Sequence, residues 1–258
     1  MSECPEICVN EAGGILEITL QRPDRKNALT HAMYSAINQA FEHAEATPAV
    51  RAVLLTGTRD CFTAGNDMVD FLNSPPLGDD APVMIFLDKL VTFSKPLIAA
   101  VNGPAVGVGT TLLLHCDLVY LGASARLQMP FTSLGLCPEA GSSYLLPMLI
   151  GHRRAAELLM LGEVMDAEQA QRFGLANAVL PDADYQQHAR EQAARIVAQP
   201  AAAVRLTKQL MRAPFVDALR AHMKVEGDVF GERLSSPEGR EAMQAFMQKR
   251  KPDFTQFD

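Results

Sequence analysis

Short, almost wholly apolar runs recur along the first half of the chain, and a connection of helix length separates each from the next. Such runs span residues 50–56, 96–101 and 118–121, and a further strand is expected over 15–20. Runs this short and apolar are typical of strands buried on both faces of a parallel sheet. Strands joined by helix-length crossovers predict an α/β fold.

Helix signals occupy the connections and the whole C-terminal part. Residues 23–26 read as a turn, Thr30 suits the N-cap position, and an amphipathic pattern continues to about Ala46. After about residue 181 only helical periodicity remains, over residues 183–198, 202–212, 215–230 and 237–249. We therefore expect a helical subdomain that follows the α/β core.

Composition excludes several classes of partner. The chain has 258 residues, 48% of them hydrophobic, which fits one large domain or two small ones. With 23 Lys and Arg against 30 Asp and Glu, the net charge is −7, so we expect neither nucleic acid nor an anionic membrane surface as a partner. No stretch approaches the roughly 20 apolar residues of a membrane-spanning helix.

The N-terminal residues and the cysteines predict a cytoplasmic protein without a metal site. The first residues lack the basic and then apolar pattern of a secretory signal. The five cysteines are odd in number and scattered, which favours reduced thiols. No histidine or cysteine pair has the spacing of metal ligands, so no metal is expected.

Two glycine-bearing turns stand where a predicted strand meets a helix. The first is Ala64-Gly65-Asn66-Asp67 and the second is Gly107-Val108-Gly109. Backbone N–H groups at such junctions are unpaired, and this edge of a parallel sheet is where ligands bind. If the turns face each other, each offers one N–H to the same oxygen, which makes an oxyanion hole. Two purely structural turns are the alternative.

Other glycine-loop sites are excluded by the residues present. Leu112 stands where a dinucleotide fingerprint needs its last glycine, and the second turn holds no lysine for a phosphate loop. Asp67 is expected to cap the helix that follows the first turn. His115-Cys116-Asp117 is expected to be a buried polar cluster and not a catalytic dyad.

Glu139 is the only acidic residue between Asp117 and Glu157, and its neighbours are apolar. A carboxyl group in apolar surroundings has a raised pKa, which suits proton transfer near neutral pH. The alternative is a carboxylate that merely complements the dipole of a following helix.

With these motifs in place, the chain resembles the crotonase (enoyl-CoA hydratase/isomerase) superfamily over almost its whole length. The matching segments are Arg22-Pro23 with Asn27-Ala28-Leu29, then 64–67, 96–107, 116–118, 174–177 and 249–254. The resemblance implies a crotonase-like spiral of ββα units over residues 1–195 and a C-terminal helical trimerisation region over 196–258. It also implies acyl-CoA thioesters as ligands and a homotrimer or hexamer. Coenzyme A is then part of the substrate, and no separate cofactor is expected.

The resemblance also implies roles for individual residues. The oxyanion donors would be the N–H groups of Asn66 and Val108, with Glu139 as the catalytic carboxylate. Arg25, Lys26 and Lys251 fall in segments that bind coenzyme A. The remaining predicted substrate-binding residues are Ala64, Asp67, Met68, Gly107 and Phe131.

Departures from the family pattern bear on the reaction. Hydratases of this superfamily use two glutamates, and the corresponding positions here are Thr111 and Phe131. Adding water needs groups that deprotonate it and protonate carbon, so these residues do not favour hydration. The run 130–144, which includes Glu139, resembles peroxisomal-type Δ3,Δ2-enoyl-CoA isomerases. We therefore expect a shift of the double bond of 3-enoyl-CoA to trans-2-enoyl-CoA, as in fatty acid β-oxidation.

Two alternatives stay open at this point. One is a hydratase or another crotonase reaction such as hydrolysis, and the other is a non-catalytic acyl-CoA binder.

A Pro- and Asp-rich stretch over 73–82 is predicted to be a mobile loop beside the site. The apolar residues that flank it either line an acyl pocket or belong to the core, namely Phe71, Leu72, Met84, Phe86 and Leu87.

Overall fold

The computed structural model describes residues 4–73, 78 and 80–257. Its main sheet has six strands in the order β1-β2-β3-β4-β6-β9, and all neighbours are parallel except β1 and β2. The strands are β1 (Ile7–Ala12), β2 (Ile15–Leu20), β3 (Ala52–Thr56), β4 (Leu97–Val101), β6 (Leu118–Gly122) and β9 (Ala178–Leu180). The α/β architecture expected from the sequence is confirmed, and the predicted strands correspond to β2, β3, β4 and β6.

A second, three-stranded sheet turns the chain into a spiral. It contains β5 (Pro104–Val106), β7 (Arg126–Gln128) and β8 (Met165–Asp166). Strand β4 leads into β5 and then α4 (Val108–Thr111), and β6 leads into β7 and then α5 (Ser142–Ile150). These are the repeated ββα units that the family resemblance implied.

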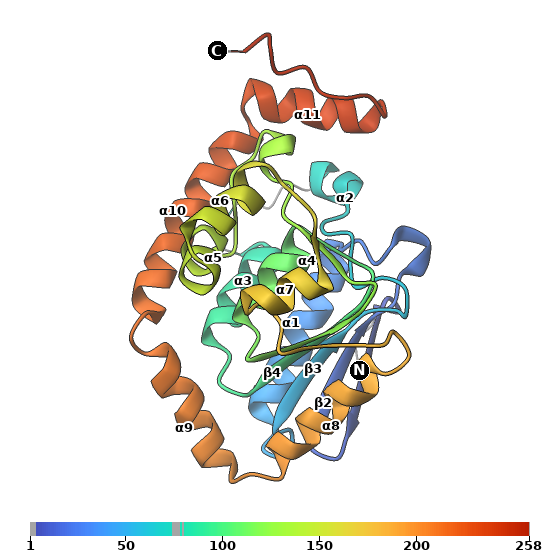
Figure 1. The fold of residues 1–258 in the computed structure, drawn as a ribbon, viewed down its shortest axis with the longest axis vertical. Helices are drawn as coiled ribbons and strands as arrows, with labels where there is room; N and C mark the ends of the chain where they lie inside the picture. Colours follow the sequence, from blue (N-terminus) through green and yellow to red (C-terminus); the bar gives the residue numbers. More distant parts are fainter. Residues whose placement is uncertain (1–3, 74–77, 79, 258) are drawn as a thin grey trace.

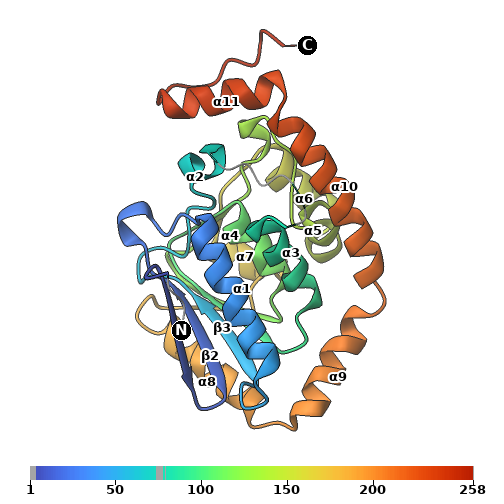
Figure 2. The ribbon, with the colours of Figure 1, turned by 180° about the vertical axis from the view of Figure 1, so that it is seen from behind.

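Helices cover both faces of the main sheet, as the alternation of side chains along the strands requires. Val53 and Leu55 of β3 point into the larger core under α1 (His31–Ala46) and α3 (Pro82–Thr92). Leu54 points the other way, into a smaller core under α8 (Tyr185–Val197). Figures 1 and 2 show α1 and α8 on opposite sides of the strands.

The predicted N-cap of α1 is confirmed, because the Thr30 side chain accepts a hydrogen bond from Met33 N. The rest of the core carries α2 (Met68–Asn73), α6 (His152–Met160) and α7 (Ala167–Phe173). Residues 74–77 and 79 of the loop predicted over 73–82 lie outside the described residues, and α3 begins at its last residue, Pro82.

Three C-terminal helices run along one side of the molecule and across its end (Figure 1). They are α9 (Ala201–Arg212), α10 (Val216–Leu234) and α11 (Pro237–Met247). Lys208 of α9, only 4% exposed, donates to Asp117 Oδ2 and Lys95 O, both at 2.7 Å, and so ties this helix to the core. The boundary predicted after residue 195 falls two residues before the end of α8. Among the described residues, no helix is long and apolar enough to cross a membrane.

Candidate active site

The two glycine-bearing turns lie side by side. Val106 N donates to Thr63 O at 3.0 Å, and Thr63 pairs with Ala105 as in a parallel sheet. Gly65 has a φ of +88°, and a Cβ added there would lie 2.8 Å from Val106 O. Only glycine therefore permits this approach of the two backbones.

The backbone N–H groups of Asn66 and Val108 come from these adjacent turns. Within the described part of the chain, neither N–H has a hydrogen-bond acceptor. Val108 opens α4, where the first N–H groups of a helix lack partners, and Gly107 before it has a φ of +57°. Their joint action on one oxygen remains a prediction.

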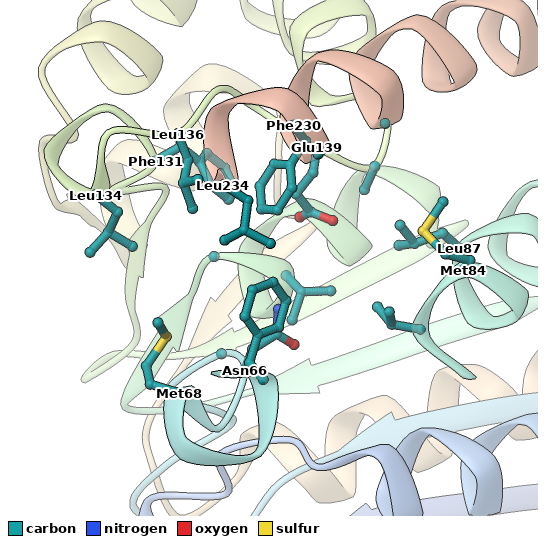
Figure 3. Close-up of a pocket in the computed structure, with 18 of the residues that line it drawn as sticks. Asn66, Met68, Met84, Leu87, Phe131, Leu134, Leu136, Glu139, Phe230 and Leu234 are labelled. Atoms are coloured by element: carbon teal, nitrogen blue, oxygen red, sulfur yellow. The ribbon is translucent and has the colours of Figure 1, made fainter. Parts of the chain in front are cut away.

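Glu139 is held against the last residue of α4. Its Oε1 accepts a hydrogen bond from Thr111 Oγ1 at 2.5 Å. Figure 3 shows the Glu139 carboxylate and the Asn66 carboxamide on opposite sides of one cavity, facing each other. The hydroxyl fixes the direction of the carboxylate without supplying a counter-charge.

Burial raises the pKa of Glu139 to about 7, against the lowering effect of the Thr111 hydrogen bond and with a further increase from the charge of Glu226. The raised pKa predicted from the apolar neighbours is confirmed. The contacts disfavour the alternative role as a helix-dipole partner: Gly141 N and Ser143 N at the start of α5 donate to Glu226, and Ser142 N donates to the backbone oxygen of Glu139 and not to its carboxylate.

Tyr34 is a site residue that the sequence analysis missed. Its hydroxyl donates to Asn66 Oδ1 at 2.5 Å, and the residue is only 3% exposed. Burial, together with the charge of Glu139, raises the pKa of Tyr34, so it stays a donor. In the sequence Tyr34 occupies the buried face of α1, where an aromatic residue reads simply as core.

A cavity of about 1460 Å³ joins these groups. It is lined by every predicted site residue except Lys251: Arg25, Lys26, Ala64, Asn66, Asp67, Met68, Gly107, Val108, Phe131 and Glu139. Lys251 follows α11 and stays a prediction. Of the uncertain apolar residues, Phe71, Met84 and Leu87 line the cavity, Phe86 belongs to the core, and the Leu72 side chain lies outside the described residues.

Helix α10 forms a wall that the sequence did not point to. It contributes Met223, Phe230 and Leu234 to the lining, and Figure 3 shows Phe230 and Leu234 across the cavity from Met84 and Leu87 of α3. No sequence signal distinguished these residues, since the apolar positions of α10 fit any packed helix. The result is an apolar chamber that opens from the polar groups around Glu139.

Other carboxylates at the cavity are paired with cations. Asp67 Oδ2 accepts from Arg22 at 2.7 Å, while its Oδ1 accepts from Val69 N and Asp70 N and thus caps α2 as predicted. Asp88 pairs with Arg220 and Asp228 with Lys224, both at 3.0 Å. Among the carboxylates that line the described cavity, Glu139 alone has no cationic partner.

The remaining sequence candidates are structural. His115 Nε2 contacts Ala140 O at 2.7 Å, and burial lowers the pKa of His115 to about 4, so its ring is neutral near pH 7. Asp117 accepts from Leu97 N and Lys208. The prediction that these residues are structural agrees with these contacts, but only His115 is buried, while Cys116 and Asp117 are half-buried. The described residues contain no group of His, Cys, Asp and Glu side chains able to hold a metal ion.

The enoyl-CoA hydratase/isomerase family model matches residues 10–257 of the chain. The chain belongs to this family. Among solved structures, that of Pseudomonas aeruginosa OdaA is 54% identical with a TM-score of 0.93, and the match covers 95% of this chain and 99% of that one. An enoyl-CoA hydratase/isomerase from Pseudoalteromonas atlantica T6c is 39% identical with the same TM-score, over 97% of this chain and 100% of that chain.

Curated relatives of similar identity bear different names. Rat "Enoyl-CoA delta isomerase 2" is 34% identical over 97% of this chain, which spans only 65% of the length of the rat protein. "2,3-Dehydroadipyl-CoA hydratase" of Escherichia coli is 33% identical, with 96% of this chain and 98% of that protein covered. The protein is therefore an enzyme of a family that processes acyl-CoA thioesters, and identity alone does not separate isomerase from hydratase.

Proposed function

We propose that the protein is a Δ3,Δ2-enoyl-CoA isomerase. The observation that carries this proposal is the Glu139 carboxylate, which alone among the carboxylates lining the described cavity has no cationic partner and lies across the cavity from the first glycine turn. A double-bond shift needs one group that removes and returns the same proton, whereas hydration also needs a group for water. Thr111 and Phe131 occupy the two positions where the family's hydratases have glutamates, and neither side chain ionises.

In the proposed reaction, Glu139 takes a proton from C2 of a 3-enoyl-CoA. The C2–H electron pair forms a new bond to C1, and the thioester oxygen receives the negative charge of the dienolate. The N–H groups of Asn66 and Val108 hold that oxygen, which such donors stabilise by roughly 3 kcal/mol each. Glu139 then returns the proton to C4, the C2=C3 bond forms, and the carbonyl is restored, so no other reactant is consumed.

Charge and shape of the cavity support an acyl-CoA as the substrate. Arg25 and Lys26 line it, and no carboxylate of the described residues forms an ion pair with either, so both charges are available to phosphate groups. The apolar walls from α3 and α10 suit a hydrocarbon chain. Lys251 is proposed to contact the coenzyme A moiety, within a homotrimer or hexamer that light scattering would test.

The direct test is incubation with 3-hexenoyl-CoA, followed by the absorbance of the conjugated product. Glu139→Gln keeps the size and the Thr111 contact but cannot take the proton, so kcat is expected to fall roughly 10³-fold with little change in KM. Thr132→Ala, in the exposed turn after Phe131 and outside the cavity lining, serves as a folded control. Full turnover by Glu139→Gln would refute the assignment.

The competing family reaction is addressed with crotonyl-CoA. Addition of water to it at a rate equal to or above that of 3-hexenoyl-CoA isomerisation would favour the hydratase alternative. Binding of both esters without exchange of the C2 proton in deuterated water would favour a non-catalytic acyl-CoA binder.

A further inference from the structure

A buried carboxylate lies behind the turn that carries Glu139. Glu226, on α10, is only 6% exposed. Its Oε2 accepts from Gly141 N at 2.6 Å, and its Oε1 accepts from Ser143 N at 3.0 Å and from the Ser143 hydroxyl. A helix from the C-terminal subdomain therefore provides the acceptor for the N–H groups of Gly141 and Ser143, which flank the first residue of α5.

The turn held by Glu226 has a backbone conformation that needs outside support. Ala140 has a φ of +58° and Gly141 a φ of +70°, and left-handed geometry at a residue such as alanine costs about 1 kcal/mol. His115 contacts Ala140 O from the core, and Glu226 binds Gly141 N from α10. Glu139 precedes these two residues, so the contacts on the turn determine where its carboxylate points.

The Ser143 hydroxyl is committed to the same contact. It donates to Glu226 and lies 2.7 Å from His222 Nε2, which is itself 3.6 Å from Glu226 Oε1. In a catalytic triad the serine hydroxyl donates to the histidine, and the histidine donates to the acid. Here the Ser143 hydroxyl donates to the acid directly, so the three side chains do not form a triad that activates a serine nucleophile. Their arrangement instead fixes the position of Glu226.

We propose that Glu226 is a positioning residue for Glu139: its carboxylate holds the 139–141 turn from behind and places a negative charge next to the proton-transferring group. The proposal rests on the role of Glu139 in the proposed function. It makes α10 part of the catalytic apparatus, in addition to the wall that α10 provides for the acyl chamber.

The charge of Glu226 has a predictable direction of effect. Burial is the main cause of the raised pKa of Glu139, and Glu226 adds to it while the Thr111 hydrogen bond opposes it. The other titratable groups coupled to Glu139 in the described residues are Tyr34 on α1 and Cys137 in its own loop, and His222 faces Glu226. Removing the charge of Glu226 alone should therefore lower the pKa of Glu139.

Three variants separate charge from position. Glu226→Gln removes the charge and keeps the length, and Glu226→Asp keeps the charge and shortens the reach. Glu232→Gln is the matched control, because it removes one charge from the same helix at an exposed position outside the cavity. Each variant is measured for kcat and KM with 3-hexenoyl-CoA from pH 5 to 9. The pKa of Glu139 is read without substrate, by carbon NMR of ¹³C-glutamate protein with Glu139→Gln for assignment.

Glu226→Gln is expected to lower the pKa of Glu139 by roughly 0.5–1 and kcat by roughly tenfold, with KM changed less than about twofold. Glu226→Asp is expected to lower kcat at a nearly unchanged pKa of Glu139. Glu232→Gln should behave as wild type. If Glu226→Gln matches Glu232→Gln in both pKa and kcat, the proposal is overturned.

Folding failure and failure of the proposed reaction give separate results. If circular dichroism shows Glu226→Gln to be unfolded, Glu226→Asp and Ser143→Ala decide the question. A loss of kcat at constant KM then supports the proposal, and wild-type kcat in both variants overturns it.

If the wild type does not isomerise 3-hexenoyl-CoA, the proposed function fails. The NMR titration then still supports the coupling if Glu226→Gln moves the pKa of Glu139, and overturns it if the pKa stays unchanged.

Discussion

Replacing the carboxyl group of Glu139 should make the protein more stable above neutral pH. An unfolded chain leaves the pKa of Glu139 near 4.5, while burial in the native site raises it to about 7. The native state thus binds the Glu139 proton more tightly than the unfolded state does. The stability that this group contributes is fully present below about pH 4.5 and is lost as the pH rises towards 7.

Glu139→Gln removes this loss, because the amide is neutral at every pH and its oxygen can still accept the Thr111 hydrogen bond. At about 1.36 kcal/mol per pH unit, a pKa that rises from 4.5 to about 7 corresponds to at most about 3 kcal/mol. Solvent reaches the carboxylate through the cavity and reduces this value. We expect the variant to be about 1–3 kcal/mol more stable than wild type at pH 8 and to differ by less than about 0.5 kcal/mol at pH 4.5.

Urea unfolding at pH 4.5 and 8, at one protein concentration because the chain is expected to associate, measures both free energies of unfolding. Glu232→Gln, at an exposed position, is the control for a simple change in net charge. A variant that is less stable than wild type at pH 8, or equally stabilised at both pH values, would contradict the reasoning.

Three further predictions concern neighbouring groups. Thr111→Val removes the hydrogen bond that lowers the pKa of Glu139, so the inflection of the kcat–pH profile near 7 should move to higher pH by roughly 0.5–1. A shift to lower pH would contradict this effect of Thr111 on the pKa. Tyr34→Phe leaves Asn66 Oδ1 without its donor, so kcat/KM for 3-hexenoyl-CoA should fall roughly threefold to tenfold. The thermal midpoint of unfolding should stay within a few degrees of wild type. Unchanged kinetics would make Tyr34 a packing residue only. Lys208→Met leaves Asp117 without its nearest cation and should cost about 3 kcal/mol in urea unfolding, and an unchanged midpoint would disprove that contribution.

Local sequence determined the central strands and the start of the first long helix. Residues 52–56 and 97–101 are apolar at every or nearly every position because both faces of those strands are buried. A short run of this kind is typical of a buried parallel strand. Thr30 marks the start of α1 because a hydroxyl there satisfies a free N–H. Strand β1 escaped prediction because it lies at the edge of the sheet with most of its side chains exposed, so it shows no apolar run.

Part of the site could also be read from the chain. Gly65 and Gly107 mark backbone geometry that side chains forbid, and Glu139 stands out as the lone acid in an apolar stretch. Each of these signals is local, since it depends on a residue type and its immediate neighbours.

Tertiary structure alone decided which distant groups lie near Glu139. Tyr34 lies 105 positions before it and Glu226 lies 87 positions after it, and both have the pattern of ordinary helix residues in the sequence. Their roles arise from helix packing: α1 brings a hydroxyl to Asn66 in the first glycine turn, and α10 brings a carboxylate to Gly141 in the turn after Glu139. Side-chain chemistry is written in the sequence, but the distance between two groups far apart in the chain is set by how the helices pack.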